Sequence, residues 1–109
     1  MILERYYLTE KMETPQDYIS IARQRPYIFN LSLCENIVLT EKFDSDKYKK
    51  LITKLHFNKY FSTEMIDNNA IIQENGKSLS GGQIKLIAFA RCLYRNRPIM
   101  ILDEVISNL

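Results

Sequence analysis

Two adjacent carboxylates, Asp103 and Glu104, follow a short apolar run near the end of this sequence. The run, residues 99–102, is apolar at every position, which is typical of a strand buried on both faces in a parallel sheet. Ligands of open α/β sheets bind beyond the carboxyl ends of the strands. Because successive side chains alternate in direction along a strand, we expect the two carboxylates to point differently and to perform different tasks.

A glycine-rich segment at residues 79–83 (Leu-Ser-Gly-Gly-Gln) precedes the carboxylates. Ser80 is a suitable N-cap, and residues 83–94 are mostly apolar without glycine or proline, which predicts a largely buried helix. The glycine-rich N-terminus of a helix exposes backbone N–H groups at the positive end of the helix dipole. The segment therefore predicts an anion site, and phosphate is the usual anion at such sites.

Together these segments resemble the ATPase domains of ABC-type transporters. Residues 79–83 match the signature motif of that family letter for letter, and residues 99–104 resemble its Walker B strand with the catalytic glutamate. Gln24 and the residues that follow it, 25–30 (Arg-Pro-Tyr-Ile-Phe-Asn), resemble the Q-loop of the exporter branch of the family. The order and spacing of the three segments make the resemblance specific.

The resemblance implies a composite site for ATP and Mg²⁺. It implies that Asp103 holds Mg²⁺ through water, that Glu104 polarises the attacking water, and that Gln24 contacts both the metal and this water. It assigns nucleotide contacts to a further set of residues: Ser80, Gly81, Gly82, Gln83 and Ser107. The γ-phosphate at this set is implied to belong to ATP held by a second ABC ATPase domain, packed head to tail. Residues 105–109, which include Ser107, match the family's D-loop only in part.

An α/β fold is needed to position these residues. We expect parallel strands at residues 19–22 and 99–102, and the resemblance implies a partial P-loop NTPase fold with an inserted helical subdomain. The expected divisions are a Q-loop strand and loop at about 18–31, the helical subdomain at about 32–78, and the signature helix, Walker B strand and truncated D-loop at 79–109.

Within the expected helical subdomain, local patterns predict individual helices. Ser32 and Glu35 have the spacing of a capping box. Apolar residues at 48, 51, 52 and 55 share one helix face, and Asp44 is placed to cap that helix. We also expect a second short helix at residues 59–65. An apolar cluster at residues 27–33 is interpreted either as core or as a groove for a partner's coupling helix, which the family would imply.

Composition excludes several classes of function. The 109 residues carry a formal net charge of +2 and 46% hydrophobic residues, which gives no indication of nucleic-acid binding. No apolar stretch reaches the roughly 18 residues that a membrane-spanning helix needs. Cys34 and Cys92 lack a CxxC spacing, so we expect reduced structural thiols, and a single histidine, His56, argues against a histidine-based triad or zinc site.

A Walker A motif is missing from this sequence. Residues 76–78 (Gly-Lys-Ser) resemble the end of such a loop, but Ile71 stands where its first glycine would be, so we interpret them as a turn. Without that loop we expect very weak ATP binding and no useful hydrolysis by this chain alone. The resemblance places the chain at the cytoplasmic face of a membrane, against a transmembrane transporter domain.

Two main interpretations therefore stand beside each other. The first is part of the ATPase of a membrane exporter, and the second is a non-enzymatic fragment or interaction module that docks on an ABC partner. A soluble ABC ATPase of DNA repair is a weaker third alternative, because no sustained heptads are present. Taken singly, Gln24 could be an ordinary loop residue, and the Asp103–Glu104 pair an ordinary turn.

Overall fold

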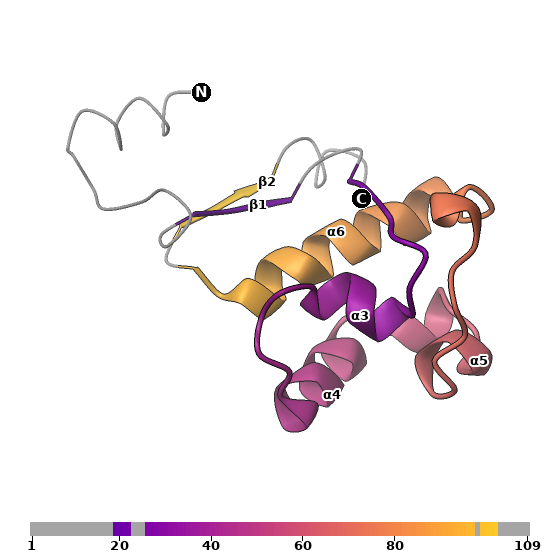
Figure 1. Ribbon diagram of the computed structural model, residues 1–109. Helices are drawn as coiled ribbons and strands as arrows, with labels where there is room; N and C mark the ends of the chain where they lie inside the picture. The colour runs from indigo at the N-terminus through magenta and orange to yellow at the C-terminus, as the bar shows by residue number, and fades with distance from the viewer. Residues whose placement is uncertain (1–18, 23–25, 98, 103–109) are drawn as a thin grey trace.

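The computed structural model describes residues 19–22, 26–97 and 99–102 (Figure 1). Its elements, in which η denotes a 3₁₀ turn, are β1 (Ile19–Ala22), α3 (Leu33–Val38), α4 (Ser45–Lys54), η1 (Phe57–Lys59), α5 (Thr63–Ile66), η2 (Glu74–Gly76), α6 (Gly81–Arg95) and β2 (Ile99–Leu102). The chain thus passes from one strand through a series of helices to a second strand, as expected for an α/β unit.

The two strands form a parallel pair. Ile19 is paired with Ile99 at one end and Ala22 with Leu102 at the other. The predicted parallel strands are therefore confirmed over the residues expected for them. Because Ala22 and Leu102 are paired, β1 and β2 end at the same level, and the next segments of chain after them contain Gln24 and Asp103 in sequence.

Helix α6 is the central element of the described structure. It lies beside the β1–β2 pair and also contacts α3 and α4, which lie on its other side (Figure 1). The side chains of Ile87, Ala90 and Tyr94 are buried in the core that these helices share. The sequence requires this position, because an apolar helix is stable in water only when its apolar faces are covered.

The core lies between α6 and the shorter helices. Leu33 and Ile37 of α3 are buried against α6, and Phe57 and Phe61 stack with ring centroids 5.3 Å apart. Each such side chain contributes about 1.5–3 kcal/mol by its removal from water. This packing fixes the direction of α6, and with it the position of both helix ends.

Side-chain caps begin the helices where the sequence predicted them. Ser32 Oγ accepts from the Glu35 N–H at 3.1 Å, and the Ser32 N–H donates to Glu35 Oε1 at 3.2 Å, which confirms the capping box. Asp44 accepts from the Lys47 N–H at 3.1 Å and begins α4. Each cap is worth about 1 kcal/mol, because it satisfies an N–H group that the helix itself cannot.

The helix expected at residues 59–65 is wrong in its extent. The structure has two separate elements in this region: the 3₁₀ turn η1, which ends at Lys59, and the helix α5, which begins only at Thr63. Tyr60 has φ −118°, and Ser62 then caps a new helix through its hydroxyl, which accepts from the Met65 N–H at 3.4 Å. The cap at Ser62 therefore overrides the continuous helix that the composition favoured.

Two further observations bear on function. Over residues 19–22, 26–97 and 99–102, no helix combines the length and the apolar character that crossing a bilayer requires. The same residues contain no group of three or more histidine, cysteine, aspartate or glutamate side chains that could hold a metal ion.

Candidate functional site

The N-terminus of α6 is formed by the predicted glycine-rich segment. Ser80 Oγ accepts from the Gln83 N–H at 3.1 Å, and Gln83 Oε1 accepts from the Ser80 N–H at 2.8 Å. The predicted N-cap is confirmed, and it is half of a reciprocal capping box that the sequence analysis had not identified. The helix begins at Gly81 rather than at Gln83, so both glycines lie in its first turn.

Two backbone N–H groups remain available at this helix end. The amides of Gly81 and Gly82 precede the first intrahelical hydrogen bond, and no acceptor in the described part of the chain binds them. Both glycines are exposed to solvent. Since α6 is 15 residues long, the positive end of a full helix dipole adds to these two donors.

The fold itself does not require glycine at these positions. A Cβ atom added to Gly81 would meet no atom within 4 Å, and one added to Gly82 would meet only Ser80 Oγ, at 3.9 Å. Gly76 differs, because its φ is +75° and an added Cβ would lie 2.8 Å from Ile28 Cγ2. Packing therefore explains Gly76, whereas Gly81 and Gly82 leave open space in front of free N–H groups. This space suits an anion such as phosphate.

Gln83 fixes this helix end to the rest of the structure. Its Nε2 donates to the backbone carbonyl of Tyr60 at 2.6 Å, in the segment between η1 and α5. The side chain thus holds Ser80 through its oxygen and Tyr60 through its nitrogen. Both polar atoms of the Gln83 side chain are therefore hydrogen-bonded within the protein.

The turn before α6 contacts the segment that follows Gln24. Asn75 has φ 53°, and its N–H donates to Asn30 Oδ1 at 2.6 Å. Its side chain donates to the Tyr27 hydroxyl at 2.9 Å and to the Ile28 carbonyl at 3.0 Å. The prediction that residues 76–78 belong to a turn is confirmed, since η2 ends there. This turn links the chain after Gln24 to the start of α6.

Beside this link lies an apolar groove with a volume of about 740 Å³. The apolar groove is lined mainly by Phe29, Leu31, Val38, Leu39, Phe43 and Ile71, together with the carboxylate-bearing Glu35 and Glu41. Phe43 and Ile71 are 55% and 48% exposed. The apolar cluster at residues 27–33 is therefore divided: Ile28 and Leu33 are core, while Phe29 and Leu31 face the groove.

Asn36 and Arg91 form a buried polar connection that the sequence analysis missed. Asn36 is fully buried, and its Nδ2 donates to the carbonyls of Phe29, Leu31 and Ser32. Burial, and secondarily the charge of Arg95, lowers the pKa of Arg91 to about 10, so its guanidinium stays charged at neutral pH. A polar residue on the buried face of a short amphipathic helix was the available signal for Asn36.

The predicted site residues fall into two sets. Ser80, Gly81, Gly82 and Gln83 are brought together at the N-terminus of α6, as described above. The other predicted residues lie outside the described part of the chain: Gln24, Asp103, Glu104 and Ser107. The predicted Mg²⁺ ligands and catalytic residues are therefore all in the second set.

Comparison with known proteins adds independent findings. A family profile described as "ABC transporter" matches residues 3–107. "ABC transporter C family member 6" of Dictyostelium discoideum is 36% identical over 107 residues, which are 98% of this chain and 8% of that protein. The "ATP-dependent lipid A-core flippase" of Wigglesworthia glossinidia brevipalpis is 39% identical over 103 residues, covering 91% of this chain and 17% of the flippase.

A third relative is the "Vacuolar heme ABC transmembrane exporter abc3" of Schizosaccharomyces pombe, 33% identical over 84% of this chain and 6% of that protein. The chain thus spans less than a fifth of the length of these relatives. Among solved structures, a bacterial Atm1-family ABC exporter with ATP bound matches with a TM-score of 0.71 and 23% identity, over 86% of this chain and 17% of that chain. Together with the family match, this likeness shows an α/β fold of the P-loop NTPase type.

Proposed function

Since the chain belongs to the ABC transporter family, we propose that it forms part of the ATP-binding and ATP-hydrolysing region of a membrane transporter, and specifically of an exporter. The observation that carries the proposal is the N-terminus of α6. There two unbound N–H groups face open space at glycines that the fold does not need. Names of relatives that include a flippase and an exporter support the exporter branch.

At this helix end, the chain binds the γ-phosphate of ATP. The N–H groups of Gly81 and Gly82 and the Ser80 hydroxyl donate hydrogen bonds to phosphate oxygens, and the helix dipole favours the negative charge. Gln83 holds Ser80 in place through the capping box and is itself anchored on the Tyr60 carbonyl. A Cβ atom on either glycine would occupy the space that the phosphate needs.

The residues proposed to hydrolyse ATP follow the ends of β1 and β2 in sequence. Asp103 would hold Mg²⁺, and Gln24 would contact the metal and the attacking water. Glu104 accepts a proton from that water, and Ser107 contacts the nucleotide. Mg²⁺ at this place would neutralise negative charge on the phosphates. The paired ends of Ala22 and Leu102 support a shared site, because both segments of chain leave the sheet at one edge.

The proposed function requires two partners, and the first is needed because the α6 N-terminus and the strand ends contact different nucleotides. A second ABC ATPase domain packs head to tail, so that the α6 N-terminus of one domain covers the nucleotide bound by the other. A transmembrane transporter domain contacts the apolar groove at the cytoplasmic face of the membrane. The proposed divisions of the chain are about 18–31 for the Q-loop strand and loop, about 32–78 for the helical subdomain, and 79–109 for the signature helix, Walker B strand and truncated D-loop.

ATP hydrolysis by the native polypeptide, meaning the protein that the source cell makes with this sequence in it, tests this function. The polypeptide is expressed with an affinity tag, and its Mg²⁺-dependent hydrolysis of ATP is compared with that of a Glu104→Gln variant. We expect the variant to lose at least about a hundredfold in kcat, because a positioned base is removed. A Glu74→Gln variant, which changes an exposed glutamate in η2, is the control and should retain full activity. Equal activity of Glu104→Gln and wild type would contradict the proposal.

A further inference from the structure

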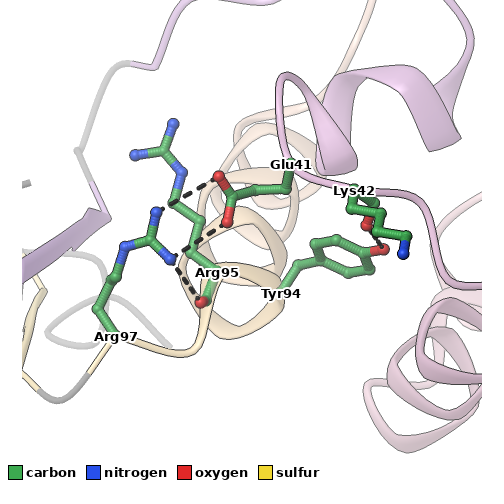
Figure 2. Close-up of polar contacts among 5 residues, drawn as sticks. All are labelled: Glu41, Lys42, Tyr94, Arg95 and Arg97. Atoms are coloured by element: carbon green, nitrogen blue, oxygen red, sulfur yellow. Dashed lines mark hydrogen bonds and ion pairs between the residues drawn. The ribbon is translucent and has the colours of Figure 1, made fainter. Parts of the chain in front are cut away.

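The connector between α3 and α4, residues 39–44, forms one wall of the apolar groove. Leu39, Glu41 and Phe43 of this connector line the groove directly. The connector contains no helix or strand, and backbone hydrogen bonds at Leu39 and Glu41 tie its first residues to α3. Its later residues are held by side-chain contacts. These contacts come from Tyr94, in the last turn of α6, and from Arg97, just after it (Figure 2).

The Tyr94 hydroxyl supplies two of these contacts. It donates to the Lys42 carbonyl at 2.8 Å and accepts from the Asp44 N–H at 2.8 Å. Tyr94 is buried, and the Lys47 ammonium lies 4.3 Å from its ring centroid. The hydroxyl therefore uses both its donor and an acceptor position to fix the backbone of the connector.

An ion pair supplies the third contact. Arg97 Nη1 lies 3.2 Å from Glu41 Oε1, and Arg97 Nη2 donates to Glu41 Oε2 at 3.4 Å, so the guanidinium and carboxylate meet at two points. Both side chains are about three-quarters buried, at 28% and 25% exposure. Arg97 Nη1 also donates to the Arg95 carbonyl at 3.2 Å, which holds the guanidinium against the end of α6 (Figure 2).

Arg97 lies directly between α6 and β2 in the sequence. It follows the end of α6 by two residues and precedes Ile99, the first residue of β2, by two. The strand β2 ends at Leu102, immediately before Asp103 and Glu104 in sequence. A two-point contact between Glu41 and Arg97 therefore joins the wall of the groove to the start of the strand that leads to these carboxylates.

We propose that Glu41 and Arg97 are positioning residues, through which the wall of the apolar groove fixes the start of β2 and so the carboxylates that follow it. This inference rests on the proposed function for the role of those carboxylates. The planar guanidinium suits the task, because two parallel hydrogen bonds to a carboxylate fix orientation as well as distance. A single-point contact would hold the strand less firmly.

Amide hydrogen exchange of β2 in the native polypeptide tests the positioning itself. Glu41→Gln removes the charge, and we expect the amides of residues 99–102 to exchange about two- to fivefold faster, a factor that an ion pair buried to this extent can sustain. Glu41→Lys places two cations together and should accelerate exchange further. In an Arg97→Met background, Glu41→Gln should have no additional effect, because the pair is already broken.

Lys42→Gln is the matched control. Lys42 lies next to Glu41 in the connector, its side chain is exposed, and it binds Tyr94 only through its backbone carbonyl. Exchange at β2 should stay at the wild-type rate in this variant. Unchanged β2 exchange in both Glu41 variants, or an equal acceleration in Lys42→Gln, would overturn the inference.

Steady-state kinetics separates this inference from the proposed function. Glu41→Gln should lower kcat for ATP about two- to fivefold and leave KM within about twofold, because the nucleotide contacts are intact. Glu104-dependent hydrolysis with an unaltered kcat in Glu41→Gln would overturn the inference and leave the proposed function standing. Absence of any Glu104-dependent hydrolysis would overturn the proposed function, while β2 exchange still decides the role of the pair.

Discussion

The guanidinium of Arg91 binds the buried Asn36 at two points. Its Nε donates to the Asn36 backbone carbonyl at 2.6 Å, and its Nη2 donates to the side-chain oxygen at 3.1 Å. The same oxygen accepts from the Phe29 N–H at 2.8 Å. The Asn36 side chain thus joins α3 to α6 and to the segment after Gln24. The proposed site requires these parts of the chain to be held together.

Loss of the Asn36 side chain should be strongly destabilising. Asn36→Ala empties a fully buried position and removes the oxygen that accepts from the Phe29 N–H and from Arg91 Nη2. The carbonyls of Phe29, Leu31 and Ser32 each lose one donor but keep a backbone N–H. We expect the free energy of unfolding to fall by about 2–4 kcal/mol, measured by urea denaturation. Asn68→Ala, at an exposed position, is the control and should change it by less than about 0.5 kcal/mol. A similar small change for Asn36→Ala would show that these hydrogen bonds contribute little.

The two kinds of glycine predict opposite effects of alanine. Gly76→Ala must adopt φ near +75° and places a methyl group 2.8 Å from Ile28 Cγ2, so we expect a loss of about 2–3 kcal/mol in thermal or urea unfolding. Gly81→Ala meets no atom within 4 Å in the first turn of a helix and should leave stability equal or slightly higher. Equal losses for the two variants would contradict the packing described here.

Local sequence patterns predict the helix caps and the strands of this structure, but not every helix boundary. The caps at Ser32 and Ser80 and the two apolar strands follow from residues close together in sequence, and each is predicted correctly. The parallel pairing of the strands joins distant residues and was expected from the resemblance to a known fold. The helix at 59–65 was predicted wrongly, because the composition does not reveal that Ser62 caps a new helix. Propensity identifies an element more reliably than it places its ends.

The connections between elements were not predictable in the same way. Arg91 binds a residue 55 positions earlier, and Asn75 binds a tyrosine 48 positions earlier. The packing of α6 against α3 brings the first pair together, and the turn η2 against the segment after Gln24 the second, so no local pattern identifies them. The free N–H groups at Gly81 and Gly82 were predictable, because they follow from the helix N-terminus alone.

The Tyr48 hydroxyl predicts a dependence of stability on alkaline pH. It is buried with no hydrogen-bond partner of good geometry among the described residues, and the Cys34 thiol lies beside it. Burial raises the pKa of Tyr48 above its ordinary value, so the folded chain keeps the proton where the unfolded chain loses it. The contribution of Tyr48 to stability is therefore present below about pH 10 and is lost as the pH rises above it.

Removal of this hydroxyl tests that dependence. Tyr48→Phe should be neutral or up to about 1 kcal/mol more stable at pH 7, and its advantage over wild type should grow above about pH 10 in urea unfolding. Burial also raises the pKa of Cys34, so some alkaline loss should persist in the variant. Tyr60→Phe changes an exposed ring and serves as the control. A variant that loses stability at pH 7 would indicate a hydrogen bond to this hydroxyl.

The central claim is that the N-terminus of α6 binds the phosphate of a nucleotide held by a second domain. Gly81→Asp tests it, because a Cβ atom at Gly81 meets no atom within 4 Å and a carboxylate in the first turn favours the helix, yet the carboxylate repels phosphate. Asn68→Asp adds the same charge at an exposed position elsewhere and is the control.

The measurement is ATP hydrolysis by the native polypeptide, made together with photolabelling by an azido derivative of ATP. We predict that Gly81→Asp lowers kcat by at least about a hundredfold, without loss of thermal stability and with ATP labelling retained. The labelling persists because the affected contacts act on the nucleotide of the other domain. Wild-type kcat in Gly81→Asp would contradict the account.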